Sequence, residues 1–153
     1  MWIKTSRFGD VEVDEQRIIT FSKGLLGFPK YKQFVLIEPG EDSYFWWLQS
    51  VELEELAFVV TDPSLFVSTY KVPLRPEQMQ GLGLNSLDEA QAFVIVNKRD
   101  HMLTGNLQGP LVVHVDRRVG EQLVLSDRRF TTRVPLMDLS QVEQSSKPQA
   151  ASA

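Results

Sequence analysis

The sequence predicts a mainly β protein, a small antiparallel β-barrel or barrel-like sandwich with one short helix. Runs of β-branched and aromatic residues alternate with turn residues about every eight to twelve positions. A single stretch near Pro76 has the composition expected of a helix. The chain has 153 residues, of which 42% are hydrophobic, and this is enough to bury the core of one domain.

The first half of the chain supplies strand signals in close succession. Residues 7–21, RFGDVEVDEQRIITF, predict a hairpin with a turn near Gly9. An apolar run at 34–37 lies between turn residues and predicts a further strand. Another β-branched run at 58–60 is stopped by Pro63 and the residue before it.

Between these strands, residues 44–50 read YFWWLQS and carry four aromatic residues side by side. Neighbouring side chains of an extended strand point to opposite faces, so Trp46 and Trp47 must separate. One of them enters the core. The other has to be covered by a loop, by the short helix or by a binding partner.

The second half predicts the helix and the remaining strands. Pro76 suits the first helical turn, and Gly81 and Gly83 are expected to stop the helix. Residues 85–91 predict either a second helical turn or a loop.

Residues 92–98 and 109–127 predict at least three further strands, and the last two of these are joined by a turn near Gly120. Residues 130–136 close the ordered part. We therefore expect one domain over 1–139, followed by a disordered tail at 140–153, which is too polar to offset its ordering entropy.

Composition excludes several classes of site and location. The chain has no cysteine, which rules out disulfides and thiolate chemistry. No apolar run is long enough to span a membrane, and the first residues do not resemble a secretory signal, so we expect a cytoplasmic protein. The net charge of −4 and the pI of 5.2 argue against direct nucleic-acid binding. A set of late arginines is interpreted as solvated surface: Arg117, Arg118, Arg128, Arg129 and Arg133.

The sequence contains no recognisable active site. Its two histidines are His101, in a predicted loop, and His114, which alternation places on the outer face of a strand. The opposite face of that strand is predicted to hold three apolar residues: Leu111, Val113 and Val115. There is no G-x-S-x-G nucleophile turn and no phosphate-binding glycine loop. We therefore predict a binding protein, not an enzyme, with no cofactor, no metal and no small-molecule ligand.

Four stretches taken together resemble the flagellar assembly factor FliW family: residues 18–38, 45–63, 92–98 and 104–114. They contain the patterns G-L-x-G-F, F-x-W-L-Q-S, F-x-V-x-D-P and N-L-x-x-P in the order and spacing of that family. The chain departs from the family pattern at a few turn and surface positions: Ser22 and Leu26 in place of proline, Gly109 in place of alanine, and His114 in place of asparagine.

Resemblance to the FliW family implies a non-enzymatic regulator of flagellin synthesis. Such a protein binds the translational repressor CsrA and antagonises it allosterically, without competing for the RNA. When cytoplasmic flagellin accumulates, it captures the FliW-like protein, and CsrA is released to repress flagellin mRNA. The acidic charge of this chain suits a basic RNA-binding partner.

Candidate partner-binding residues follow from charge and from the aromatic strand. We predict an electrostatic face made up of four acidic residues: Glu52, Glu54, Glu55 and Asp62. We predict that Trp47 and Phe66 are apolar anchors. A helical segment of flagellin would need an apolar groove. Candidates for such a groove at a barrel mouth are Phe93, Ile95, Leu107 and Leu111.

Two other classes of function remain open at this point. A nucleic-acid-binding β-barrel would stack bases on the aromatic strand and hold phosphates with the late arginines. An enzyme or small-ligand protein would use the barrel interior, and would need titratable groups that point inward. The predicted inward residues are apolar, which ranks this class last.

Overall fold

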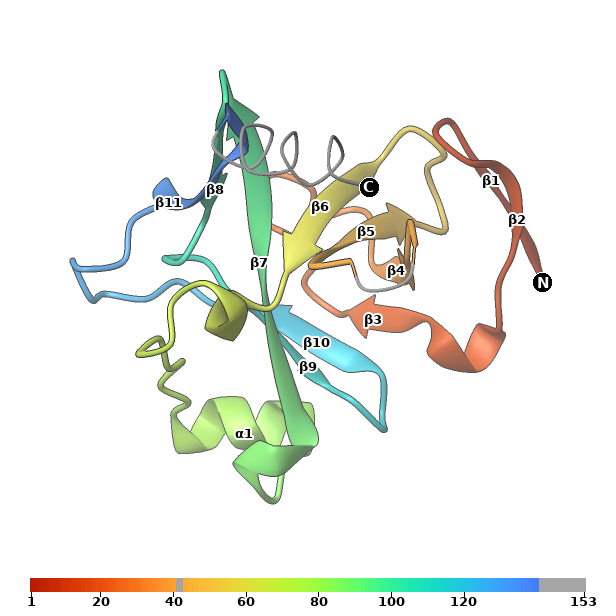
Figure 1. Ribbon diagram of the computed structural model, residues 1–153. Coiled ribbons are helices and arrows are strands. Elements are labelled where there is room, and N and C mark those ends of the chain that lie inside the picture. Colours follow the sequence, from red (N-terminus) through yellow and green to blue (C-terminus); the bar gives the residue numbers. More distant parts are fainter. Residues whose placement is uncertain (41–42, 141–153) are drawn as a thin grey trace.

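A computed structural model describes residues 1–40 and 43–140 of the chain (Figure 1). Strands dominate this part, with one α-helix and three short 3-10 turns. The strands are β1 (Trp2–Thr5), β2 (Gly9–Glu12), β3 (Ile19–Phe21), β4 (Gln33–Ile37), β5 (Phe45–Ser50), β6 (Ala57–Thr61), β7 (Ala90–Arg99), β8 (Met102–Gly105), β9 (Leu111–His114), β10 (Val119–Gln122) and β11 (Val134–Asp138). The helical elements are η1 (Glu15–Arg17), η2 (Pro63–Leu65), α1 (Pro76–Leu82) and η3 (Leu87–Glu89).

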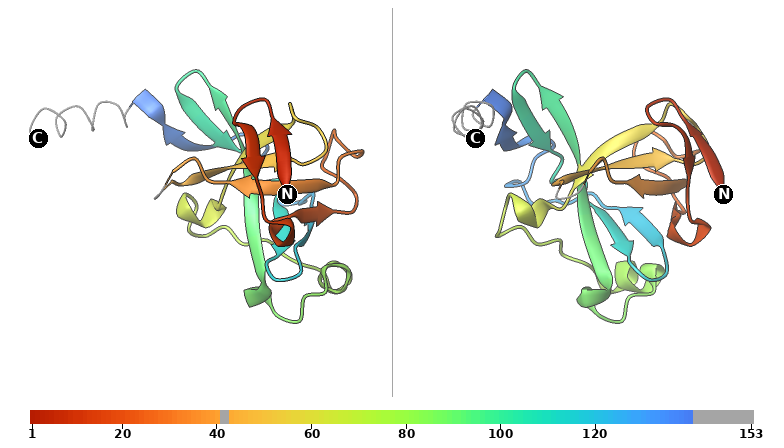
Figure 2. Two further views of the ribbon diagram at one scale, coloured as in Figure 1. Left: turned by 90° about the vertical axis from the view of Figure 1, so that its right-hand side faces the viewer. Right: turned by 45° about the vertical axis from the view of Figure 1, so that its right-hand side comes forward.

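The main sheet closes on itself, which confirms the predicted barrel-like architecture. Its order is β11-β8-β7-β6-β5-β4-β3-β10-β9, and β9 also pairs with β7. Seven strands, β7, β6, β5, β4, β3, β10 and β9, therefore form the ring (Figures 1 and 2). All the ring pairings are antiparallel except β3 with β10, which is parallel. This parallel contact brings together strands from the two halves of the chain.

The long strand β7 takes part both in the closed ring and in an extension of the sheet beyond it. Its first residues, 90–93, pair with β9 and close the ring, whereas residues 96–99 pair with β8. The edge strand β11 pairs with the far side of β8. The strands β7, β8 and β11 therefore project beyond the ring as a three-stranded extension (Figure 1).

The prediction that residues 7–21 form a hairpin is wrong about which strands pair. In the structure β2 pairs back with β1, and the two form a separate two-stranded sheet. The chain then turns through η1, where the side chain of Asp14 accepts from the backbone N–H of Gln16. This turn carries β3 away from β2 and into the ring, beside β4.

Three apolar clusters hold the elements together. The ring interior is filled around Phe21 and Phe34, whose rings meet edge to face at 5.8 Å. A second cluster lies between α1 and the ring and includes Leu107. The third lies under the β1–β2 hairpin, where Ile3 packs near Val35 of β4. Strands that carry apolar residues on both faces are therefore covered on both.

The helix begins at Pro76, as predicted, but does not stop at Gly81. Gly81 lies within α1, and the chain leaves the helix at Gly83, which has the left-handed φ of 70° typical of a helix end. In the segment 85–91, η3 forms one short helical turn capped by Ser86. The alternative of a second helical turn is thus the one that the structure adopts.

The predicted placement of His114 on an exposed strand face is wrong. All four residues of β9 are buried, and the side chain of His114 is only 2% exposed. One face of β9 supplies Leu111 to the ring interior, and the other supplies Val112 to the cluster beneath α1. Val115, which was predicted to point inward, is exposed because it follows the end of the strand.

Gly120 lies inside β10, and not in the turn that precedes it. The turn comprises residues 115–118, with Arg118 at a φ of 56°. A Cβ atom at Gly120 would lie 2.6 Å from a ring carbon of Phe21, which is buried. The position therefore needs glycine for close packing and not for a turn.

We expect Gly120→Ala to lower the free energy of unfolding by about 1–3 kcal/mol, because the fixed Phe21 ring cannot move aside. Gly81→Ala is the matched control, since nothing lies within 4 Å of a Cβ added there. That change should stabilise α1 by about 0.5–1 kcal/mol. Urea unfolding of both variants measures the difference, and equal stabilities would refute the packing explanation.

Glu89 at the end of η3 links this turn to β9. Backbone N–H groups of Asn85 and Ser86 donate to its Oε1 at 2.7 and 3.0 Å. Its Oε2 lies 3.5 Å from Nε2 of His114, a buried atom with no hydrogen-bond partner in the described residues. The hydrogen bond from Asn85 is the main cause that lowers the pKa of Glu89, and the charges of His114 and Arg117 lower this pKa further.

A lowered carboxyl pKa in the folded state makes the contribution of Glu89 to stability dependent on pH. The contribution is complete above the ordinary glutamate pKa of about 4.3 and is lost as the pH falls through and below that value. We expect Glu89→Gln to lower the Tm at pH 7, and the difference from the parent protein to shrink at about pH 3. Thermal unfolding at both pH values tests this, and a difference independent of pH would contradict it.

Candidate partner-binding surface

The two adjacent tryptophans of β5 separate as predicted. Trp46 packs against the ring interior, with its ring 6.2 Å from that of Phe93. Trp47 points outward and is covered by the turn of the β1–β2 hairpin. Phe8 meets its ring edge to face at 5.9 Å, and the guanidinium of Arg7 lies 4.0 Å from the ring centroid. Trp47 is therefore half-buried, and the hairpin is the loop that covers it.

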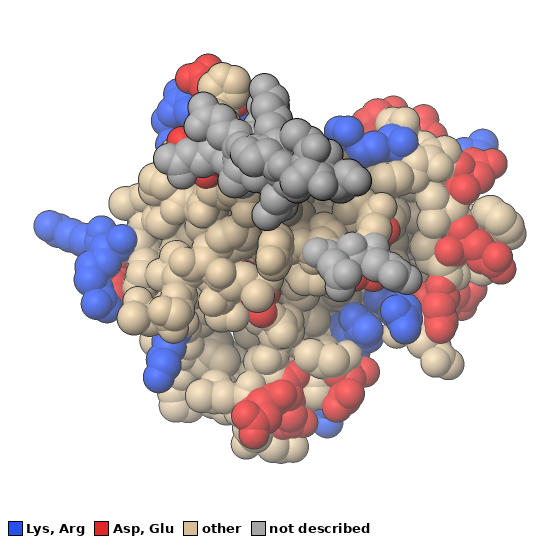
Figure 3. All heavy atoms as spheres, viewed as in Figure 1, with Lys and Arg blue, Asp and Glu red and all other residues tan. Residues whose placement is uncertain are grey.

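A partly exposed aromatic patch lies at the start of β5 and at the end of η2. We define it as Tyr44, Phe45, Leu65 and Phe66. The ring of Phe66 stacks on Phe45 at 5.7 Å and meets Tyr44 edge to face at 6.2 Å. Tyr44 is 55% exposed and Leu65 50% exposed. Figure 3 shows that the face containing β6 and β7 has a broad central area with few charged side chains.

Local hydrogen bonds fix the aromatic patch. Asp62 caps η2, since its Oδ1 accepts from the backbone N–H and the hydroxyl of Ser64 at 2.9 and 2.7 Å. Pro63 occupies the first position of this turn, which places Phe66 at its end. The hydroxyl of Thr61 donates to the carbonyl of Tyr44 at 2.5 Å and ties the two segments together. The patch is thus presented on a braced surface.

The predicted acidic residues do not form one group. The carboxylate of Glu52 accepts the backbone N–H groups of Lys32 and Gln33 at 2.7 and 2.8 Å, so it holds the approach to β4 in place. Glu54 and Glu55 are exposed in the turn between β5 and β6, next to Arg7.

Five of the six predicted site residues therefore fall into two sets at opposite ends of β6, and the sixth, Trp47, pairs with Val59 in the middle of that strand. One set is the β5–β6 turn with its glutamates and the nearby hairpin over Trp47. The other is Asp62 with Phe66, beside the aromatic patch. Five residues of β6 separate them, a span of about 16 Å at 3.3 Å per residue. Sequence reasoning missed Tyr44, Phe45 and Leu65, although Tyr44 and Phe45 open the same aromatic run.

The four residues predicted to line an apolar groove at a barrel mouth do not form one. Leu107 and Leu111 are at most 1% exposed and belong to the core. Phe93 and Ile95 are half-buried and pack against the ring interior. All four residues contribute to packing and leave no open apolar channel at that position.

The late arginines lie in two separate places. Arg117 and Arg118 are in the turn between β9 and β10, whereas the other three lie in the segment before β11 (Figure 1). Arg129 is paired with Asp127 at 2.7 Å, and this pairing lowers the pKa of Asp127. The arginines therefore do not gather beside the aromatic strand, as a base-stacking surface would require.

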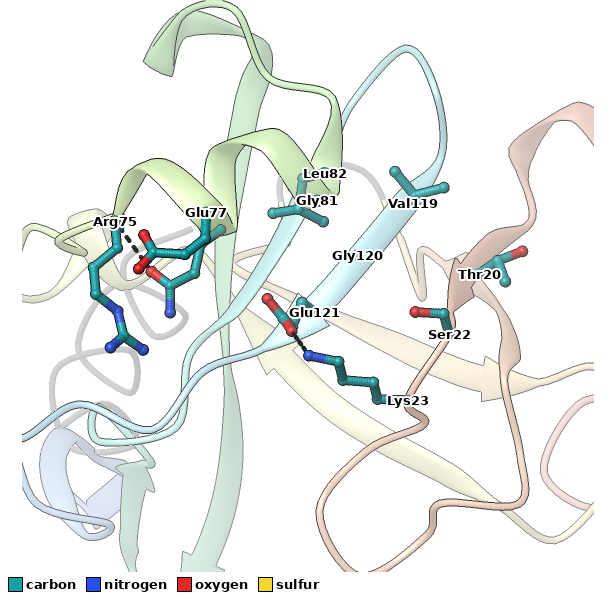
Figure 4. Close-up of a pocket in the computed structure, with 11 residues that line it drawn as sticks. Thr20, Ser22, Lys23, Arg75, Glu77, Gly81, Leu82, Val119, Gly120 and Glu121 are labelled. Carbon is teal, nitrogen blue, oxygen red and sulfur yellow. Dashed lines mark hydrogen bonds and ion pairs between the residues drawn. The ribbon is translucent and has the colours of Figure 1, made fainter.

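A polar cleft of about 530 Å³ separates α1 from β10 and the end of β3 (Figure 4). On the side opposite α1, Lys23, which follows β3, and Glu121 of β10 form an ion pair of 2.6 Å. The backbone N–H of Arg75 donates to the side chain of Gln78 at 2.8 Å. The charges nearest the middle of this cleft thus neutralise each other.

The part of the chain that the structure describes contains no group of three or more His, Cys, Asp or Glu residues placed to hold a metal ion. No helix in residues 1–40 and 43–140 is long and apolar enough to cross a membrane. Ser140, the first residue of the predicted tail, donates to the carboxylate of Asp138. The rest of that tail, 141–153, lies outside the described residues.

Comparison with known proteins relates this chain to one family. The FliW protein family model matches residues 2–136. The flagellar assembly factor FliW of Leptospira interrogans serogroup Icterohaemorrhagiae serovar Lai (strain 56601) is 42% identical over 145 residues, with 92% of this chain and 96% of that protein covered. The corresponding protein of Bdellovibrio bacteriovorus is 41% identical over 138 residues, covering 89% and 79%.

A solved structure supports the same conclusion. The crystal structure of a flagellar assembly factor FliW superposes with a TM-score of 0.82 at 34% identity, and the match covers 90% of this chain and 97% of that one. Sequence and fold therefore agree over almost the full described length. This chain belongs to the FliW family of flagellar assembly factors.

Proposed function

We propose that this protein is a non-enzymatic partner switch in flagellum assembly, which binds and antagonises the translational repressor CsrA and is captured by cytoplasmic flagellin. Family membership supports the role in flagellum assembly. The observation that carries the binding role is the braced aromatic patch around Phe66, in which the half-buried rings of Phe45 and Phe66 lie beside the exposed side chains of Tyr44 and Leu65. Apolar side chains exposed around aromatic anchors are typical of protein-binding surfaces.

We assign the aromatic patch to flagellin. Unassembled flagellin would offer an amphipathic helical segment, and such a segment binds through apolar anchors. Tyr44 and Leu65 present apolar surface to solvent, and Phe66 provides a ring fixed between two others. Asp62 supplies a single charge at the edge of the patch, as at the polar rim of an interface.

We assign the β5–β6 turn at the other end of β6 to CsrA. Glu54 and Glu55 are exposed there, and negative charge suits a protein whose basic surface holds RNA phosphates. The net charge of −4 works in the same direction. Glu52 takes part only indirectly, because its carboxylate is already bound to two backbone N–H groups.

The two surfaces are close enough to exclude simultaneous binding. A standard interface buries about 800 Å² on each partner, which corresponds to a patch roughly 30 Å across. The two sets of residues are separated by the five residues of β6, about 16 Å. A bound flagellin would therefore overlap the volume needed by CsrA.

Calorimetric titration of the purified protein tests the proposal with CsrA and with unassembled flagellin from the same organism. We expect binding to each. The double variant Glu54→Gln/Glu55→Gln should weaken CsrA binding and leave flagellin binding intact. If neither partner binds the folded protein, the proposal is wrong, and steeply salt-dependent binding of RNA would favour the nucleic-acid alternative instead.

A further inference from the structure

A polar pocket of about 400 Å³ lies on the extension formed by β7, β8 and β11, away from both proposed protein-binding surfaces. Strand alternation places Ile95, Asn97 and Arg99 on one face of β7. On β8, Thr104 pairs directly with Asn97 and shares that face. At Ile95 this face of β7 packs against the ring interior. Farther along the strand, where the extension leaves the ring, the same face is polar.

The pocket is lined by cations and neutral hydrogen-bonding groups, with no carboxylate among its lining residues. Lys98 and Arg99 come from β7, and Arg133 comes from the segment that enters β11. None of these three cations forms an ion pair within residues 1–40 and 43–140. Lys98 follows Asn97 and points to the other face of β7, so Arg99 and Arg133 supply the unneutralised positive charge on the pocket face, and this charge favours an anion.

Thr104 is a second feature of the pocket, independent of the charges, that points to a ligand. Its side chain lines the pocket although the residue is only 8% exposed, and its hydroxyl has no hydrogen-bond partner in the described part of the chain. The hydroxyl is not among the fully buried polar atoms that lack a partner, so it reaches the open space of the pocket, where it can donate to a ligand oxygen. Next to it, Asn106 accepts from Gly109 through Oδ1, and its amide N–H groups have no acceptor in the same part of the chain.

The chemistry of these donors selects a compact oxyanion. Guanidinium and ammonium groups with hydroxyl and amide donors match the many acceptor oxygens of a phosphate group. No aromatic residue lines the pocket, so it offers no platform for stacking a nucleic-acid base. Its volume suits a small molecule and not a protein segment or a folded RNA.

We propose that this pocket binds the phosphate group of a small phosphorylated ligand, with Arg99 and Arg133 as charged donors and Thr104 as the hydroxyl donor on the pocket wall. This site would make the protein responsive to a phosphorylated small molecule in addition to its protein partners. It differs from the expectation of no small-molecule ligand that the sequence alone supports.

Pyrophosphate and inorganic phosphate are the probes for this site, added to the full chain at low ionic strength and followed by amide chemical shifts and calorimetry. We expect saturable binding, with shifts concentrated on residues 97–106 and 131–133. Arg133→Gln should weaken pyrophosphate binding about tenfold or more. The matched control Arg128→Gln removes an arginine outside the pocket lining and should leave binding unchanged.

Thr104→Val separates ligand binding from folding. Because its hydroxyl has no partner in the described residues, the variant should retain or raise the Tm without ligand, and yet bind pyrophosphate several-fold more weakly. No saturable binding to the parent protein would overturn the proposal. So would equal losses in the Arg128 and Arg133 variants, which mean nonspecific charge attraction. Binding of an RNA oligonucleotide without binding of pyrophosphate would also overturn it.

Discussion

Replacing Phe34 by alanine is expected to lower the free energy of unfolding by about 3–5 kcal/mol, which is comparable to the whole stability of a small domain. Phe34 is fully buried at the centre of the ring interior. Its ring contacts Phe21 of β3 and Phe58 of β6, at centroid distances of 5.8 and 6.3 Å. The side chain therefore joins strands on different sides of the ring, and its removal leaves a cavity that they cannot close.

Trp2→Ala is the control for Phe34→Ala, because Trp2 is an aromatic residue of similar size that is 67% exposed. Its loss should change the free energy of unfolding by about 0.5 kcal/mol or less, as expected for a surface site. Denaturant unfolding of both variants provides the comparison. A loss of under 1 kcal/mol for Phe34→Ala would show that this cluster is not what holds the ring closed.

Replacing Phe66 by alanine is expected to weaken flagellin binding about tenfold to a hundredfold, as for a central interface anchor. Phe66 is the ring on which both neighbours of the aromatic patch pack. Phe28→Ala is the matched control. Phe28 is also partly exposed and meets one aromatic ring, that of Phe58 at 5.5 Å, but it lies outside the patch. Titration of both variants with unassembled flagellin gives the comparison.

Equal binding losses in the Phe66 and Phe28 variants would show that the aromatic patch is not the flagellin-binding surface. Thermal unfolding of each variant shows whether a loss of binding reflects local unfolding.

Trp47 is expected to behave differently from Phe66. Because Phe8 and Arg7 cover it, Trp47→Ala should loosen the β1–β2 hairpin and reduce stability more than it reduces binding.

Local patterns in the sequence were sufficient for most strands, for the start of the helix and for the barrel-like class. Alternation correctly sent Trp46 and Trp47 to opposite faces, since that depends only on strand geometry. Pairing partners were harder to predict. The β2 strand pairs with β1 because the capped turn η1 redirects the chain, and the pattern of residues 7–21 contains no information about which neighbour is chosen.

Alternation failed at β9 for a physical reason. The rule assumes one buried and one exposed face, whereas β9 is covered by the ring interior on one side and by the cluster beneath α1 on the other. His114 is consequently buried beside Glu89, which approaches from a distant turn. Likewise, the requirement for Gly120 arises from the Phe21 ring across the parallel β3–β10 contact.

The sequence did not predict how the candidate site residues are arranged in space. Asp62 and Phe66 do lie together, since both belong to the η2 turn. Their separation from the β5–β6 turn depends on the direction of β6, which the sequence pattern does not convey. Tyr44 and Phe45 join Phe66 only through the pairing of β5 with β6.

The most direct test of the partner switch begins with the preformed complex of this protein and fluorescently labelled CsrA, followed by anisotropy as unassembled flagellin is added. We predict that the anisotropy falls to that of free CsrA in a saturable manner. With the Phe66→Ala variant the same release should require about tenfold to a hundredfold more flagellin. A stable complex containing all three proteins, or CsrA binding that flagellin does not affect, would contradict the mutually exclusive binding proposed for the two ends of β6.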